Sequence, residues 1–169
     1  MANYEDALKG ADLRSIGKSN LIAGNIHDQR SFDTLFDLLF HADRKVAMRA
    51  ADAIEKITIT NPSFIKQHKK KLLALFDNDN EIEMKWHLAQ IIPRLELTKN
   101  ERLKVWNILF AWAKDKNGSR IVRTNAIQSL HALLPYLKEN NHQFMQLISS
   151  VYQENIPSIN ARIRKLRIS

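Results

Sequence analysis

The chain of 169 residues contains no cysteine and only four glycines and four prolines. The absence of cysteine excludes disulfides, a thiolate nucleophile and zinc sites built on cysteine. So few glycines and prolines disfavour a turn-rich β protein and a disordered chain, and 44% hydrophobic with 26% charged residues is usual for a folded protein. We therefore expect a helical domain that buries a core without cross-links.

Hydrophobic targeting and membrane segments are also missing. Residues 1–6 are polar and acidic with no apolar run behind them, which argues against a signal peptide. No stretch approaches the length that a membrane-spanning helix needs. The expectation is a soluble, cytoplasmic protein with no membrane association.

Sequence signatures of catalysis are lacking as well. The six histidines form neither a His-x-x-x-His pair nor a His-Glu-x-x-His motif, which gives a metal site little support. The four glycines are isolated, so the sequence has no glycine-rich phosphate loop. We expect no catalytic residue, no metal and no cofactor.

The formal net charge is +8, and its excess lies in the second part of the chain. Residues 1–60 contain eight Lys and Arg against nine acids, whereas residues 61–169 contain eighteen against nine. A lysine cluster occupies residues 69–71, and the densest cationic run comprises Arg162, Arg164, Lys165 and Arg167. Such clusters are commonly solvated helix faces, so they favour an acidic partner only weakly.

A pattern of apolar residues at helical spacing recurs every 38 residues. Its first copy comprises Val46, Ala50, Ala51, Ala53, Ile54 and Ile57. In this copy and the two that follow it, seventeen of the eighteen positions are apolar, and Ser129 is the exception. A degraded fourth copy follows at an offset one residue shorter and contains Ile159, Ile163 and Leu166. The recurrence predicts one helix, repeated with the same buried face.

Each repeated helix is preceded by another apolar helical stretch and a polar turn, so the repeating unit is a helical hairpin. Thr98 and Glu101 fit a capping box, while Pro93 should bend its helix and Pro135 should close or kink the next one. No long linker interrupts the chain, which predicts a single domain over residues 1–169. Its expected parts are an atypical N-terminal cap over residues 1–30 and hairpins over residues 31–60, 61–97, 98–140 and 141–169.

The second helices resemble those of HEAT repeats. The segment Asp43-x-x-Val46-x-x-x-Ala50-Ala51-x-Ala53-Ile54 has the family's pattern. Likewise, Val122-Arg123-x-x-Ala126-Ile127-x-x-Leu130 is similar to its Val-Arg-x-x-Ala core. The resemblance covers roughly residues 31–168. It implies an all-α, right-handed α-α superhelix of about four antiparallel helix pairs plus an N-terminal cap, in which the second helices line a concave binding surface.

Lys85 and Arg123 occupy equivalent positions in their helices, immediately after the first apolar residue. The resemblance implies that such a cation pairs with an acid in the turn, and the candidates are Asp77, Asp79 and Asp115. A recurrent cation is usually part of a repeat's own bonding, so a structural role is favoured over ligand contact.

A second row comprises Arg49, His87 and Asn125, with Lys56 and Arg94 one turn further along. If the recurrent apolar residues face the core, this row should point away from it and supply concave contacts. Together with Lys85, Arg123 and the C-terminal cations, these residues could neutralise phosphates or meet an acidic protein segment. An ordinary hydrated surface explains such a row equally well.

Trp86 lies between Lys85 and His87, and its repeat equivalents are Met48 and Thr124. An exposed indole between cations could stack on a base or anchor a peptide. The favoured alternative is a large residue that fills the gap made by Pro93. The sequence leaves both interpretations open.

The leading hypothesis is a noncatalytic scaffold that binds a protein partner, or another copy, through its concave surface. The alternative is a nucleic-acid-binding module that uses the basic C-terminal half. A third and weaker hypothesis rests on the similarity of some DNA-repair glycosylases for alkylated bases, which are helical-repeat proteins with a carboxylate on a basic concave face. Asp52, with Glu55 beside it, would be the acid here.

Overall fold

The computed structural model describes residues 4–9, 16–78 and 81–168, and in this part of the chain it contains helices and no strand. The all-α prediction is thereby confirmed. The α-helices are α1 Tyr4–Leu8, α2 Ile16–Asn25, α3 Gln29–Asp37, α4 Arg44–Thr60, α5 Lys69–Asn78, α6 Ile82–Ile91, α7 Lys99–Lys114, α8 Arg120–Leu133, α9 Asn141–Gln153 and α10 Pro157–Lys165. The 3-10 helices are η1 Leu38–Phe40, η2 Pro62–His68, η3 Ile92–Arg94, η4 Leu134–Tyr136 and η5 Lys138–Asn140.

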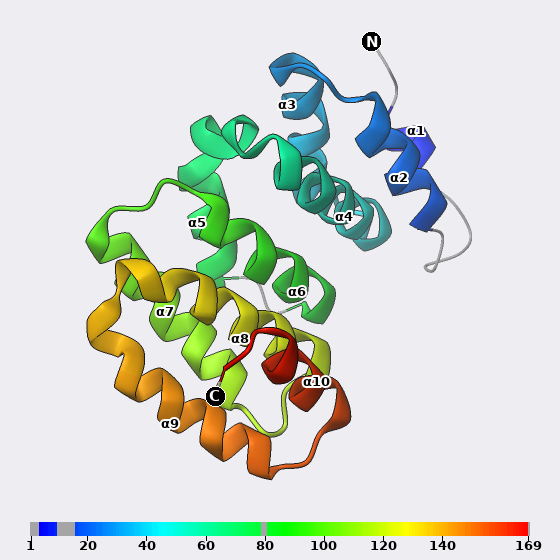
Figure 1. Cartoon of the computed structure of the whole chain (residues 1–169). Helices are drawn as coiled ribbons and strands as arrows, with labels where there is room; N and C mark the ends of the chain where they lie inside the picture. The colour runs from blue at the N-terminus through cyan, green and yellow to red at the C-terminus, as the bar shows by residue number, and fades with distance from the viewer. Residues whose placement is uncertain (1–3, 10–15, 79–80, 169) are drawn as a thin grey trace. The chain divides into compact units, whose positions relative to one another are not determined.

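The chain divides into two compact units, Met1–Leu75 and Phe76–Ser169. In the first unit α4 is the central helix, and α1, α2, α3 and η2 all pack against it (Figure 1). The recurrent apolar residues of α4 are fully or almost fully buried, as their helical spacing predicts. Phe32 of α3 packs on Phe64 of η2 with ring centroids 5.4 Å apart, which joins these two helices beside α4. Residues 10–15 of the expected N-terminal cap lie outside the described residues.

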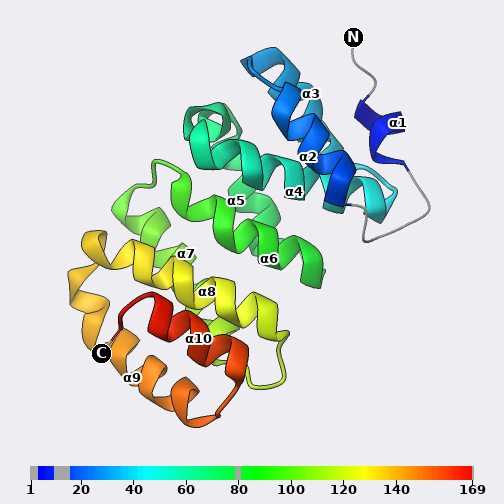
Figure 2. The same cartoon turned by 45° about the vertical axis from the view of Figure 1, so that its right-hand side comes forward.

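The second unit consists of two layers of helices. The second helices α6, α8 and α10 lie side by side, with α8 in the middle (Figures 1 and 2). Helices α7 and α9 form the other layer, where the ring of Trp106 packs on Phe144 and its indole Nε1 donates to Oε1 of Gln143 at 3.1 Å. Trp106 and Phe144 are fully buried, so the core lies between the layers.

Local sequence signals act at the helix ends as expected. The capping box is present, because Glu101 N–H donates to Thr98 Oγ1 at 3.3 Å and Thr98 N–H donates to Glu101 Oε2 at 2.7 Å. Pro135 follows the end of α8 at Leu133, so its predicted closing role is confirmed. Pro93 does not bend a continuous helix: α6 ends at Ile91 and a 3-10 turn carries the chain past the proline, which has no N–H to donate.

Candidate binding surface

The row Arg49, His87 and Asn125 is buried, and the prediction that it points away from the core is wrong. Arg49 is 3% exposed, and His87 and Asn125 are buried as well. Arg49 Nη1 donates to the carbonyl of Leu8 at the end of α1. Asn125 Nδ2 donates to the carbonyl of Trp86 in α6 at 3.4 Å. Both side chains therefore bond the backbone of a neighbouring helix instead of meeting a ligand.

The error arises because a second helix has two kinds of neighbour. The recurrent apolar residues mark the side of the helix that packs on the first helices. Arg49 and Asn125 lie on a different side, where α4 meets α1 and α8 meets α6. Ser129, the one polar residue in the recurrent apolar pattern, belongs to this contact, since its Oγ donates to the carbonyl of Ala89 at 2.5 Å. Ser129 was the sequence signal for this contact between helices. A small polar residue at a position that is otherwise apolar suits a close approach to the backbone of another helix.

Arg123 is a structural cation, as predicted, and the carboxylate that it binds is Glu154 instead of Asp77 or Asp115. Its side chain is 1% exposed, and Nε donates to the carbonyl of Ala113 at 3.1 Å in the last turn of α7. Nη1 and Nη2 bind the two carboxylate oxygens of Glu154 at 2.8 and 2.9 Å. The hydrogen bonds from Arg123 hold the pKa of Glu154 below its ordinary value. Of the proposed partners, Asp79 lies outside the described residues.

Lys56 is occupied within the first unit. Its Nζ lies 2.5 Å from Oδ2 of Asp52 and 3.3 Å from Oγ of Ser19, and the Ser19 hydroxyl also donates to Asp52. These contacts tie α2 to α4 and neutralise the carboxylate that the glycosylase-like hypothesis would use. The geometry gives Asp52 a role in packing two helices.

Lys85 and Trp86 are neighbours in sequence whose side chains have different surroundings. Lys85 Nζ lies 5.6 Å from the ring centroid of Trp112, so it extends towards α7 in a cation–π contact. The Trp86 ring is half-buried and lies 5.0 Å from the ring of His87. Lys85 and Arg123 are thus engaged with first helices, and Arg94 is half-buried at the end of η3.

Apolar side chains are exposed where α6 and α8 begin. Ile82 is 51% exposed and Ile121 is 41% exposed. Because Asn125 bonds Trp86 and Ser129 bonds Ala89, α6 and α8 run parallel in a fixed register. Ile121 precedes Asn125 by one turn and Ile82 precedes Trp86 by one turn, so the two isoleucines lie at the same end of these adjacent helices. We name Ile82, Trp86 and Ile121 the α6–α8 strip.

The C-terminal cations form the second feature of this unit. They lie in the last turn of α10 and its C-terminal cap, where Arg167 adopts a left-handed conformation with φ of 54°. Arg164, Lys165 and Arg167 are exposed and Arg162 is half-buried. None of the four forms an ion pair with a carboxylate of residues 4–9, 16–78 or 81–168. Cations suit the carbonyl end of a helix, yet their charge remains available to a ligand.

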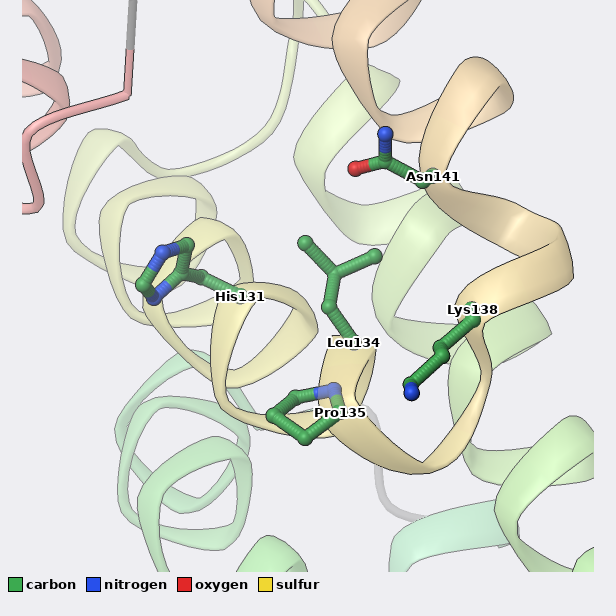
Figure 3. A pocket seen from close by; sticks show the side chains of 5 residues that line it. All are labelled: His131, Leu134, Pro135, Lys138 and Asn141. Atoms are coloured by element: carbon green, nitrogen blue, oxygen red, sulfur yellow. The ribbon is translucent and has the colours of Figure 1, made fainter.

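A shallow cavity of about 400 Å³ opens where α8 ends and α9 begins. Figure 3 shows Lys138 and Asn141 reaching towards Leu134 and Pro135, with the ring of His131 turned to the other side. The lining combines the side chains of His131, Lys138 and Asn141 with the apolar carbons of Leu134 and Pro135.

Comparisons with protein-family models, curated proteins and solved structures give no match to this chain. Across the described residues, no helix is both long and apolar enough to cross a bilayer. The same part of the chain holds no group of three or more His, Asp or Glu side chains placed to bind a metal ion. What the chain can bind must therefore be inferred from its surface.

Proposed function

We propose that the chain is a noncatalytic binding module of the HEAT-repeat type, which engages a protein partner through the exposed face of its second helices. The 38-residue recurrence and the paired layers of the second unit support this assignment. So do the side-chain bonds of Arg49 and Asn125, because each side chain reaches the backbone of another helix that packs against its own.

The α6–α8 strip is the observation that carries this proposal. Single exposed apolar residues are ordinary, but here two exposed isoleucines and a half-buried indole lie in the first turns of two adjacent helices. Their backbones are fixed by bonds from Asn125 and Ser129, so the strip is held rigidly before a partner arrives. Aromatic and aliphatic groups on a rigid helical surface are typical anchors of protein interfaces.

The test is selection of short random peptides, displayed on phage, against the whole chain. Clones that bind the strip should lose about tenfold in affinity on Ile121→Ser or Trp86→Ala. The matched control is Ile59→Ser, because Ile59 is an isoleucine of α4 in the first unit and is 65% exposed. Selected clones that bind both strip variants as tightly as the native chain would contradict the proposal.

A second candidate function, binding of nucleic acid, is favoured by the four cations of the α10 end. If it is correct, a short single strand or duplex binds at low salt and the affinity falls steeply as salt is added. Replacing Arg162, Arg164, Lys165 and Arg167 by Gln should then abolish binding. The absence of binding to either oligonucleotide at low salt excludes this candidate.

A further inference from the structure

The α6–α8 strip and the α10 cations belong to one layer of three parallel helices. The recurrence aligns Val122 and Ala126 of α8 with Ile159 and Ile163 of α10, and all four are buried. With that alignment Lys165 takes the place that Gln128 has on α8 and Gln90 has on α6. Gln90 and Gln128 are half-buried and Lys165 is exposed, so the row changes from neutral to cationic as it crosses the layer.

At the position that Trp86 has on α6, helices α8 and α10 carry small side chains, of which Thr124 is buried and Ala161 is exposed. Thr124 and Ala161 are the repeat equivalents of Trp86 on α8 and α10. The Thr124 hydroxyl donates to the carbonyl of Arg120 in its own helix at 2.7 Å, so it does not project as a competing donor. The backbone of a partner segment that crosses the layer can therefore approach α8 and α10 closely, while a large apolar side chain of the same segment contacts the strip.

We infer that the partner segment is acidic, that it crosses α6, α8 and α10 in an extended conformation, and that its apolar residues and its acidic residues occupy opposite ends. This inference rests on the proposed function and names the chemistry of its ligand. Charge complementarity supports the choice, since the α10 cations are free of described carboxylates while the strip supplies no charge.

The layer also sets the spacing within the segment. Packed helices have axes about 8–10 Å apart, so α6 and α10 are separated by about 16–20 Å. The strip lies where α6 and α8 begin and the cations lie where α10 ends, so the segment spans at least this lateral distance. An extended chain advances about 3.3 Å per residue, so at least about five or six residues connect the two ends of the segment. A helical segment would need about twice as many, because it advances only about 1.5 Å per residue.

The experiment uses the peptides selected from the random library on the whole chain. Sequences that depend on the strip should carry Asp or Glu clusters at least about five or six residues from an aliphatic or aromatic anchor. Their affinity should fall about tenfold in the variant Arg164→Gln, Lys165→Gln, Arg167→Gln. A variant with the same charge change, Lys114→Gln, Lys116→Gln, Lys138→Gln, is the control, because these three lysines are exposed elsewhere in the second unit.

The possible results separate this inference from the proposed function. Peptides that depend on the strip but lack acidic residues, or that bind the α10 variant normally, overturn the inference and leave the proposed function intact. Selected peptides that are indifferent to Ile121→Ser and Trp86→Ala overturn both. A short oligonucleotide that binds more tightly than the selected peptides and displaces them identifies nucleic acid as the occupant and overturns the inference.

Discussion

Arg123 connects three helices through one buried guanidinium. It bonds the last turn of α7 through Ala113 and the end of α9 through Glu154, while its own backbone belongs to α8. A bidentate arginine–carboxylate pair combines charge attraction with fixed geometry, and the remaining Nε–H is satisfied by a carbonyl that lacks a partner within its helix. Removing one partner of this buried pair should therefore cost more stability than removing one partner of an exposed ion pair.

We expect Arg123→Met to lower the free energy of unfolding by about 2–4 kcal/mol, because it leaves Glu154 without its partner. Glu154→Gln should cost less, and the double variant should cost less than the sum of the two single changes, since the two groups share one interaction. Urea denaturation measures all three values. The exposed Arg164→Met is the control and should change stability by less than about 0.5 kcal/mol. Additive costs would mean that the pair is energetically uncoupled.

The same pair predicts a dependence of stability on pH. Because the folded pKa of Glu154 lies below its ordinary value of 4.5, the pair stabilises the fold fully above that value. The contribution is lost as the pH falls from 4.5 through the lowered folded pKa. Other carboxyls, including Asp33 and Glu139, also have lowered pKa values and contribute to acid unfolding. The difference in stability between the native chain and Glu154→Gln should therefore shrink below pH 4.5, and a constant difference would contradict this assignment.

At this scale the sequence predicted the role of Arg123 and missed its partner. The recurrence with Lys85 marked both as repeat positions, but it said nothing about which carboxylate would lie within reach. Glu154 comes from the end of the next first helix, 31 residues away, and only the packed structure brings it to Arg123. Lys85, at the equivalent position, is placed over the Trp112 ring instead. Equivalent positions in a repeat therefore do not ensure equivalent partners.

At the scale of the helices, apolar periodicity predicted where the second helices lie in the sequence. It did not predict which of their faces pack against a neighbouring helix. Helices α4 and α8 cover the predicted segments, since a repeated stripe of apolar residues requires a helix to bury it, whereas α6 ends at Ile91, before Pro93. The stripe fixes the side that meets the first helix. It does not distinguish a polar residue that faces solvent from one that bonds the adjacent helix, which is why Arg49, His87 and Asn125 were misplaced.

This distinction can be tested on α8 with three neighbouring positions. Ser129→Ala and Asn125→Ala should each lower the free energy of unfolding by about 1 kcal/mol, because each removes a donor to a carbonyl of α6. Gln128→Ala is the control, since Gln128 is half-buried in the outer row, and it should cost less than about 0.5 kcal/mol. Chemical denaturation gives the three values. A larger loss for Gln128→Ala than for the other two would invert our assignment of the faces.

At the scale of the whole chain, stability is local. The chain has no cysteine, so no disulfide joins distant segments, and each unit is held by contacts between neighbouring helices. In such an architecture a lost contact weakens its own surroundings first and distant repeats little. Arg123 belongs to Phe76–Ser169, whereas Arg49 and the Leu8 carbonyl that it bonds belong to Met1–Leu75.

Replacing each of these two arginines should therefore speed the hydrogen exchange of backbone amides mainly in the unit to which that arginine belongs. Arg123→Met should speed exchange mainly in α7, α8, α9 and α10, and Arg49→Met mainly in α1 and α4, because the hydrogen bonds described above for each arginine lie within one unit. Each variant serves as the control of the other, which removes any general effect of losing a buried arginine. Equal acceleration in both units by either variant would show that the chain opens as one cooperative body, and the layer of α6, α8 and α10 would then share its stability with the N-terminal helices.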